Sequence, residues 1–189
     1  LDYARMSLDD DIKAARQKIS ESIEGLNSTI QDIRAYVLDL RPRQLRGGET
    51  LTRGIQRLLD EFRHNTNTKT KLATSEDGLA GLPRQNALAL FHICQEALAN
   101  VARHAQAEEV DVQVWTADEQ ALLKISDNGR GFMLEDTGEL IGHGLSNMHR
   151  RARKVGGDVK IASTPEQGTT ISAWVPWKHL PSAPPDELE

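Results

Sequence analysis

Asp127-Asn128-Gly129-Arg130-Gly131-Phe132 is the stretch that decides the fold of this chain, and it follows an apolar run, Ala121-Leu122-Leu123-Lys124-Ile125-Ser126. An aspartate at the end of a predicted strand, followed by two glycines, places a carboxylate beside backbone with little side-chain cover. The carboxylate can accept a hydrogen bond from an exocyclic amine, and the glycines let a flat ring such as a nucleobase approach the main chain. Taken alone, the hexapeptide is more typical of an ordinary turn.

A second group of polar residues lies on the helix predicted from Pro83 to about Ala105. They recur at steps of three or four, and therefore share one face: Glu96, Asn100 and Arg103 or His104. The amide oxygen of Asn100 can ligate Mg²⁺ without adding charge, and Glu96 can orient or deprotonate a nucleophile. Arg103 or His104 could meet a phosphate. By itself this face is more typical of a solvated helix surface, but together with the aspartate-glycine stretch it favours a magnesium-nucleotide site.

Two further glycine motifs have both a structural and a functional interpretation. Gly142-His143-Gly144-Leu145 is predicted to close a mobile loop over residues 128–142 and to open a helix whose free amides can receive phosphate. It could equally be a flexible hinge, and a nucleotide lid needs hinges. Gly168-Thr169-Thr170 is either a hairpin turn or part of the nucleotide edge.

The order of predicted elements indicates an α+β fold. Thr50 is expected to cap a helix with apolar residues from Leu51 to Phe62, and strands are expected over 66–74, 109–116, 120–127, 159–163 and 169–175. A further helix over 145–155 should end at Gly156-Gly157. We expect a two-layer α/β sandwich, a mixed sheet with helices on one face, preceded by a long coiled-coil helix.

The N-terminal part carries a heptad seam. Apolar residues from Ile12 to Leu40 fall mostly at steps of three and four, and Leu40-Arg41-Pro42 should end the helix. So narrow a seam predicts a partner helix, either in another chain or upstream. The predicted organisation is 1–42 as a helical dimerisation element, 43–177 as a globular domain joined by the polar link 43–49, and 178–189 as a disordered acidic, proline-containing tail.

Bulk properties narrow the function classes. The 189 residues carry a formal charge of -5, so binding to nucleic acid through bulk charge is not expected. The single cysteine, Cys94, fits a reducing compartment and core packing. Neither a signal-peptide pattern nor an apolar run long enough to cross a bilayer is present, which predicts no membrane contact and a cytoplasmic location. The chain starts at Leu1 inside a polar segment and is expected to be part of a longer protein.

In combination, these motifs resemble the ATP-binding domains of histidine kinases, members of the GHKL superfamily with its Bergerat-type fold. The stretch from Glu96 to Ala105 resembles the N box, Asp127 to Phe132 the G1 box, and Gly142 to Leu145 the G2 box. Gln95-Glu96-Ala97-Leu98, Gly144-Leu145-Ser146-Asn147-Met148 and Leu40-Arg41-Pro42 are similar to kinases that signal to NarL-type response regulators.

The resemblance implies roles for individual residues and partners. Asp127 would bind the adenine amine of ATP, Asn100 would hold Mg²⁺, and Glu96 would support proton transfer or positioning. Gly129, Gly131, Gly142 and Gly144 would shape the pocket and lid. The remaining residues implied in nucleotide binding are Arg103, His104, Phe132, His143, Leu145 and Thr169. The full-length protein would form a homodimer through its N-terminal helices and phosphorylate a NarL-type response regulator.

Two departures from the family pattern matter. None of the six histidines precedes an acidic residue, as a phosphoacceptor histidine would, so this chain is not expected to phosphorylate itself alone. Arg150 replaces a common acid, which affects local lid contacts only. Two alternatives stay open: a GHKL ATPase in which Glu96 activates water, and a non-catalytic nucleotide-binding dimerisation module.

Overall fold

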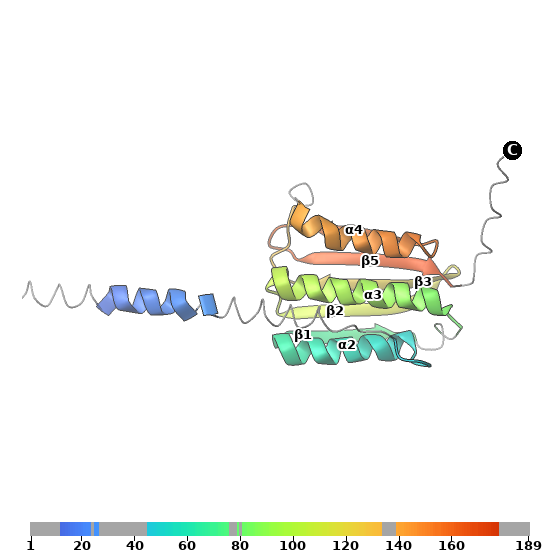
Figure 1. Cartoon of the computed structure of the whole chain (residues 1–189), viewed down its shortest axis with the longest axis horizontal. Coiled ribbons are helices and arrows are strands. Elements are labelled where there is room, and N and C mark those ends of the chain that lie inside the picture. Colours follow the sequence, from blue (N-terminus) through green and yellow to red (C-terminus); the bar gives the residue numbers. More distant parts are fainter. Residues whose placement is uncertain are drawn as a thin grey trace, which may run out of the picture.

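The computed structural model describes residues 12–23, 25–26, 45–75, 79, 81–133 and 139–177. These residues contain a five-stranded sheet with the order β1-β2-β3-β5-β4 (Figure 1). Its strands are β1 (Lys69–Thr74), β2 (Glu109–Ala117), β3 (Gln120–Asp127), β4 (Asp158–Ser163) and β5 (Thr169–Pro176). β1 runs parallel to β2 and the other neighbours are antiparallel, so the prediction of a mixed sheet is confirmed.

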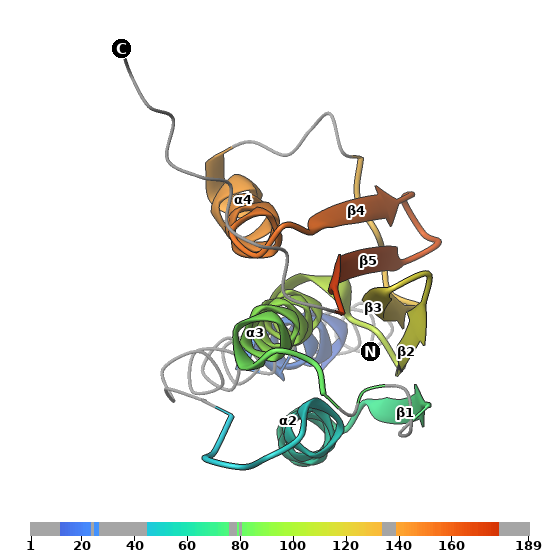
Figure 2. The same cartoon turned by 90° about the vertical axis from the view of Figure 1, so that its right-hand side faces the viewer.

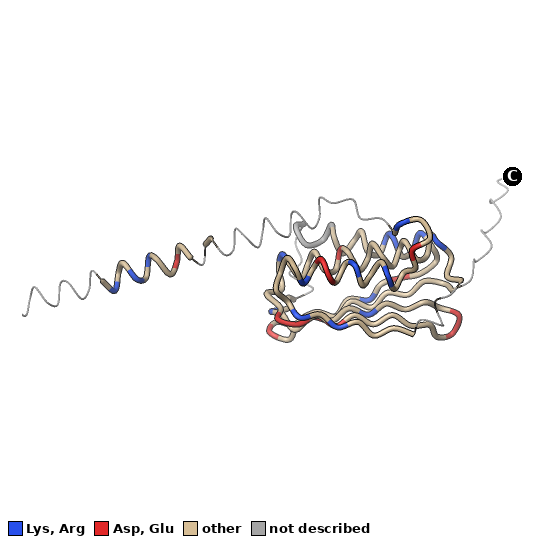
Figure 3. The backbone as a smooth tube through the Cα atoms, turned by 90° about the horizontal axis from the view of Figure 1, so that it is seen from below, with Lys and Arg blue, Asp and Glu red and all other residues tan. Residues whose placement is uncertain are grey.

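Three helices form the second layer of the sandwich: α2 (Leu51–Thr66), α3 (Arg84–Asn100) and α4 (Glu139–Arg153). Figure 2 shows α2 beside β1, α3 over the middle of the sheet and α4 beside β4. Figure 3 shows the helices as one layer above the sheet, and no described helix covers the opposite face. The predicted two-layer arrangement is therefore confirmed.

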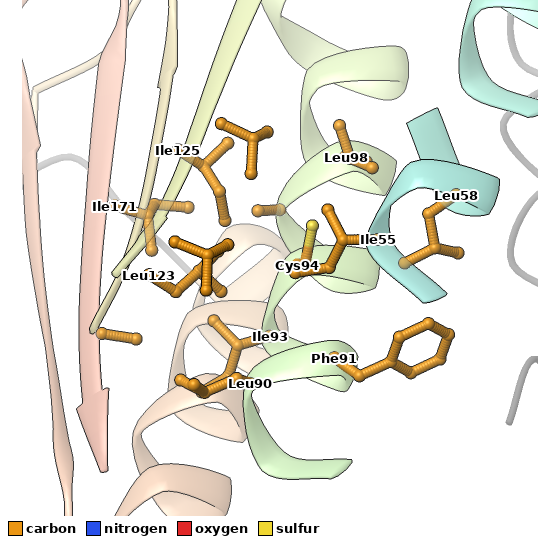
Figure 4. Close-up of a cluster of buried hydrophobic side chains, with 14 of the residues drawn as sticks. Ile55, Leu58, Leu90, Phe91, Ile93, Cys94, Leu98, Leu123, Ile125 and Ile171 are labelled. Atoms are coloured by element: carbon orange, nitrogen blue, oxygen red, sulfur yellow. The ribbon is translucent and has the colours of Figure 1, made fainter. Parts of the chain in front are cut away.

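The core lies between the sheet and the helix layer, in which α2 packs beside α3. Strand residues alternate between buried and more exposed positions, as expected for a sheet covered on one face. Leu123, Ile125 and Ile171 face α3 from the sheet, while Ile55 and Leu58 approach α3 from α2 (Figure 4). All five are buried. Cys94 lies in this core, and burial raises the pKa of its thiol to about 12, which agrees with plain packing.

α2 begins where the sequence predicts. The hydroxyl of Thr50 accepts a hydrogen bond from the N–H of Arg53 at 3.4 Å, and the left-handed Asn67 ends the helix. One face of α2 is buried from Leu51 to Phe62, which confirms the predicted amphipathic helix. The following strand starts at Lys69, later than the predicted residue 66, because α2 extends through Thr66.

The polar link before α2 contributes to the core. Leu45 is 3% exposed, and a Cβ added to Gly54 would overlap its Cδ2 and lie 3.2 Å from the ring of Phe91. The carbonyl of Leu45 accepts a hydrogen bond from Arg84 at 3.0 Å. Glu49 binds the guanidinium of Arg57 through both carboxylate oxygens, at 3.2 and 3.0 Å. The link is therefore packed against α2 and α3 from Leu45 onward.

The structure describes only part of the predicted N-terminal helix, and it changes the predicted start of α4. Residues 12–23 and 25–26 are helical, and the seam residues Ile12, Ile19, Ile23 and Leu26 are 50–63% exposed. The rest of the predicted coiled coil and the tail 178–189 lie outside the described residues. The prediction that α4 starts at Leu145 is wrong, because the helix begins at Glu139 and includes Gly142 and Gly144.

Asp158, the first residue of β4, forms hydrogen bonds with residues at the end of α4. These bonds lead us to expect that the stability of the fold depends on pH. Hydrogen bonds from His149, from the N–H of Val159 and from Arg153 lower the pKa of Asp158 to about 2, with the His149 bond contributing most. Because the folded-state pKa is depressed, this stabilisation is present above about pH 4 and is lost as the pH falls towards 2.

We therefore expect Asp158→Asn to lower the urea midpoint at neutral pH and to flatten its decrease on acidification below about pH 4. Asp118→Asn, in the exposed β2–β3 turn, is the matched control and should follow the parent curve. Parallel pH profiles for Asp158→Asn and the parent would contradict the assignment.

Candidate functional site

Asp127 is the last residue of β3 and lies inside the sheet, between β2 and β5. The register places it opposite Val110 of β2 and Thr169 of β5. Its Oδ1 accepts a hydrogen bond from the N–H of Gly129 at 2.9 Å. Partial burial raises the pKa of Asp127, although the N–H groups of Gly129 and Thr169 act in the opposite direction. The carboxylate is thus fixed in a partly dehydrated position where a further donor is a favourable partner.

Main-chain hydrogen bonds hold the loop after Asp127 on both sides. The N–H of Arg130 donates to Ala105 at 2.8 Å, and the carbonyl of Arg130 accepts from Glu166 at 2.6 Å. Asn128 Oδ1 accepts from the backbone N–H groups of residues 108 and 109 at 3.0 and 2.9 Å. The loop is therefore tied to the end of the α3 segment, to the start of β2 and to the β4–β5 hairpin.

The glycines of this loop are required by close backbone approach. A Cβ on Gly129 would overlap the carbonyl oxygen of Ala105, and a Cβ on Gly131 would overlap that of Thr164. Gly131 also has a φ of +57°, which disfavours any residue with a side chain. The N–H of Phe132 then donates to Ser163 Oγ at 3.0 Å. These contacts place Arg130 and Phe132 at the rim of the space above Asp127.

The other wall of the site comes from α3 and α4. Glu96 and Asn100 lie one turn apart on α3, and Gly144 of α4 lies against them. A Cβ on Gly144 would lie 2.6 Å from Glu96 Oε1 and 3.6 Å from Asn100 Nδ2. α3 continues into a π-helical turn over Val101–Ala105, a distortion that is frequent at functional sites. The missing side chain at Gly144 therefore lets α4 approach the two polar residues.

A cavity of about 620 Å³, including its open mouth, lies among these elements. Its apolar lining residues are Ala97, Val101, Ala105, Ile125, Phe132, Leu145 and Ile171. Its other lining residues are Asn100, His104, Asp127, Arg130, Gly131 and Thr169. An apolar cavity with a few convergent polar groups is typical of a site for a small organic ligand. Asp127 and Asn100, from separate elements, are brought together here.

The predicted site residues divide into four groups. Asn100, His104, Asp127, Gly131, Phe132, Leu145 and Thr169 line the cavity. Glu96, Gly129 and Gly144 support its walls without lining it, and Arg103 lies outside the lining. Gly142 and His143 lie within α4, so Gly142-His143-Gly144 does not open that helix as predicted. The side chain of His143 lies outside the described residues.

Sequence reasoning missed some of the lining. Arg130 appeared only as the residue between two glycines. Ile125 and Ile171 were assigned only to predicted strands, although each lies two residues from a predicted site residue on the same strand face, Asp127 and Thr169 respectively. That alternation was the available signal for the apolar part of the cavity.

This arrangement of a strand-end aspartate, two glycines and an asparagine on the facing helix agrees with the comparison to known families. Residues 85–179 match the family described as histidine kinase-, DNA gyrase B- and HSP90-like ATPase. The chain belongs to this ATPase family. Its N-box, G1-box and Gly144 segments lie inside the matched range.

Relatives of this chain include sensor histidine kinases and a sensor protein. The sensor histidine kinase MctS of Rhizobium johnstonii is 34% identical over 179 residues, which cover 93% of this chain and 38% of the relative. The sensor histidine kinase LiaS of Bacillus subtilis is 34% identical over 167 residues, which cover 88% and 44%. The sensor protein VraS of Staphylococcus aureus is 32% identical over 162 residues, which cover 84% and 45%. The chain spans less than half the length of these relatives.

Solved structures support the fold of this family member. The histidine kinase domain of the Erythrobacter litoralis EL346 blue-light activated kinase matches with a TM-score of 0.53 at 19% identity, covering 68% of this chain and 62% of that chain. The histidine kinase AdeS of Acinetobacter baumannii matches with a TM-score of 0.52 at 12% identity, covering 85% and 83%. At these identities the likeness concerns the fold alone.

The remaining expectations concern membrane-spanning helices and metal-binding groups among the described residues. None of the described helices has the length and apolar character that crossing a membrane requires. Over the same residues, no three His, Cys, Asp or Glu side chains gather into a metal-binding group.

Proposed function

We propose that this chain is the ATP-binding catalytic part of a two-component sensor histidine kinase. The observation that carries the proposal is the cavity that has the Asp127 carboxylate at one side and Asn100 of α3 at another. Asp127 accepts a hydrogen bond from the exocyclic amine of adenine, and the apolar lining covers the ring. Asn100, supported by Glu96 and Gly144, faces the phosphates.

The chain's own residues fit a magnesium-nucleotide. Mg²⁺ is usually held by one or two protein oxygens together with substrate phosphates, and the amide oxygen of Asn100 is such a ligand. The cation would supply charge neutralisation for the phosphates. Glu96 lies next to Gly144 and Asn100, where its carboxylate orients the reacting group.

The wider activity follows from the sensor kinases among the relatives. In the full-length protein, the γ-phosphoryl group would pass to a histidine and then to a response regulator of the NarL type. The heptad residues of the N-terminal helix, exposed in the single chain, would pair in a homodimer. We place this domain in the cytoplasm, where ATP and the regulator are found.

Asn100→Ala tests the magnesium assignment. Removing the amide oxygen should lower the affinity for a non-hydrolysable ATP analogue in the presence of Mg²⁺, by about tenfold if one charge-assisted contact is lost. Affinity without Mg²⁺ should change little, because the adenine contacts stay. Calorimetric titration of both proteins, with and without Mg²⁺, measures the difference.

The matched control is Asn65→Ala, which removes an amide from α2, outside the cavity lining. An equal loss of affinity for Asn100→Ala with and without Mg²⁺ would show that Asn100 acts by a route other than the cation. A parallel assay of phosphate release separates the two enzyme hypotheses. Sustained hydrolysis by the chain alone, abolished in Glu96→Gln, would favour the ATPase over the kinase.

A further inference from the structure

A second groove lies between α3 and α4, outside the lining of the nucleotide cavity. Leu88 and His92 of α3 line one side, and Arg151, Lys154 and Val155 at the end of α4 line the other. Leu88 and Val155 are partly buried, while Arg151 and Lys154 are exposed. Within the described part of the chain, neither cation forms an ion pair with a carboxylate. The groove thus combines an apolar floor with unneutralised positive charge.

His92, which also lines the groove, is neutral or cationic and cannot offset the charge of Arg151 and Lys154. Burial lowers the pKa of its imidazole, and the nearby charge of Arg151 lowers it further, although the contact with Gln95 opposes the shift. The basic residues of α4 gather at the end of the helix layer where α4 ends, as the blue segments in Figure 3 show. A fitting occupant is therefore acidic and carries an apolar side chain for the floor.

The last strand of the sheet ends beside this groove. The carbonyl of Pro176, at the end of β5, accepts a hydrogen bond from Asn86 at 2.6 Å. Asn86 is next in sequence to Gln85, which lines the groove. Figure 1 shows that α3 begins, α4 ends and β5 ends at the same end of the molecule. The end of β5 therefore lies beside the groove, and a chain of twelve residues can reach about 40 Å when extended.

The C-terminal segment has the chemistry that the groove requires. Its last residues are Pro184-Pro185-Asp186-Glu187-Leu188-Glu189, with three carboxylates around one leucine. We propose that residues 184–189 bind in the α3–α4 groove of the same chain, with Leu188 on the floor between Leu88 and Val155. Asp186, Glu187 and Glu189 pair with Arg151 and Lys154. The connecting segment 178–183 spans the distance from β5.

Each contact of residues 184–189 with the groove is weak, but the covalent connection to β5 favours their binding. Exposed ion pairs are individually weak, so the segment as a free peptide would bind poorly. A short connection raises its effective concentration to about the millimolar range. We therefore expect a salt-sensitive interaction within one chain that involves none of the nucleotide-binding residues.

Paramagnetic relaxation in the full 189-residue chain tests the proposal. Ser182→Cys provides the labelling site, because Cys94 is wholly buried with its thiol pKa raised to about 12. A spin label at residue 182 should broaden the amide signals of residues 85–92 and 151–155 severalfold more than those of the β2–β3 turn. Raising the salt to about 1 M, where the Debye length is about 3 Å, should remove most of that difference.

Charge reversal provides the specificity test. Arg151→Glu with Lys154→Glu should abolish the selective broadening, and adding Asp186→Lys with Glu187→Lys should restore it. Arg150→Glu with Lys160→Glu makes the same charge change at exposed positions outside the groove lining and should leave the broadening intact. Broadening that is spread evenly over the surface, or that survives the Arg151 and Lys154 reversal, would overturn the proposal. ATP affinity is unaffected by either outcome, so the proposed function is tested separately.

Discussion

Asp127→Asn is expected to weaken ATP binding by about 10- to 100-fold, the effect of losing one hydrogen bond to a charged group. The carboxylate is held by backbone donors and partly dehydrated, so its remaining capacity is directed at the ligand. Calorimetry with a non-hydrolysable ATP analogue measures the loss. Adenosine should show a similar fold-change, because the contact is to the base and not to the phosphates.

Stability provides the control for this variant. The pKa of Asp127 is raised in the folded state, so the fold binds the proton more tightly than the unfolded chain does. Ionisation of this group therefore costs stability as the pH rises through the raised pKa. Asp127→Asn should consequently be at least as stable as the parent at neutral pH, while Asp118→Asn should change neither property. ATP binding by Asp127→Asn at the parent affinity would contradict the adenine assignment.

Gly131→Ala is expected to cause the largest loss of stability among the loop glycines, about 3 kcal/mol or more. Its φ of +57° is unfavourable for alanine, and the new Cβ would overlap the carbonyl of Thr164. Because Phe132 and Arg130 border the cavity on either side, the displacement should also weaken ATP-analogue binding. Urea unfolding and calorimetry measure the two effects.

Alanine substitutions at two other glycines separate backbone strain from steric overlap as causes of the destabilisation. Gly48 has a φ of +77° and nothing within 4 Å of the added Cβ, so Gly48→Ala reports backbone strain alone, about 1 kcal/mol. Gly129 lacks the positive φ but meets the carbonyl of Ala105, so Gly129→Ala reports the overlap alone. The expected order of destabilisation is Gly131, then Gly129, then Gly48. Equal losses at Gly131 and Gly48 would mean that the loop relaxes and does not fix the site.

The positions of the polar residues of the site could be predicted, because they follow from the periodicity of one strand and one helix. Asp127 ends a strand whose alternation is clear, and Glu96 and Asn100 are one helical turn apart. The start of α4 could not be predicted in this way. Gly142 and Gly144 are poor helix formers, but tertiary contact decides here, because Gly144 gives α4 the close approach to Glu96 that a side chain would prevent.

The apolar part of the cavity was hidden for a different reason. Ile125 and Ile171 have the pattern of core residues, and nothing in a linear sequence distinguishes a side chain that packs on protein from one that borders a cavity. Arg130 is a similar case, since its position at the rim follows from the hydrogen bonds of its backbone to Ala105 and Glu166. Each of these two hydrogen bonds joins residues far apart in the chain, so local sequence patterns do not reveal them.

The burial of Leu45 sets a limit on where a foreign segment can be joined to this domain. Leu45 precedes the first helix of the sandwich, yet it packs on Gly54 and Phe91, and its carbonyl binds Arg84. A fusion that joins a foreign segment after this residue would remove the side chain that packs on Gly54 and the acceptor of Arg84. Replacement of the preceding segment is therefore compatible with this fold only at junctions upstream of Leu45, so that this leucine is kept together with the sheet.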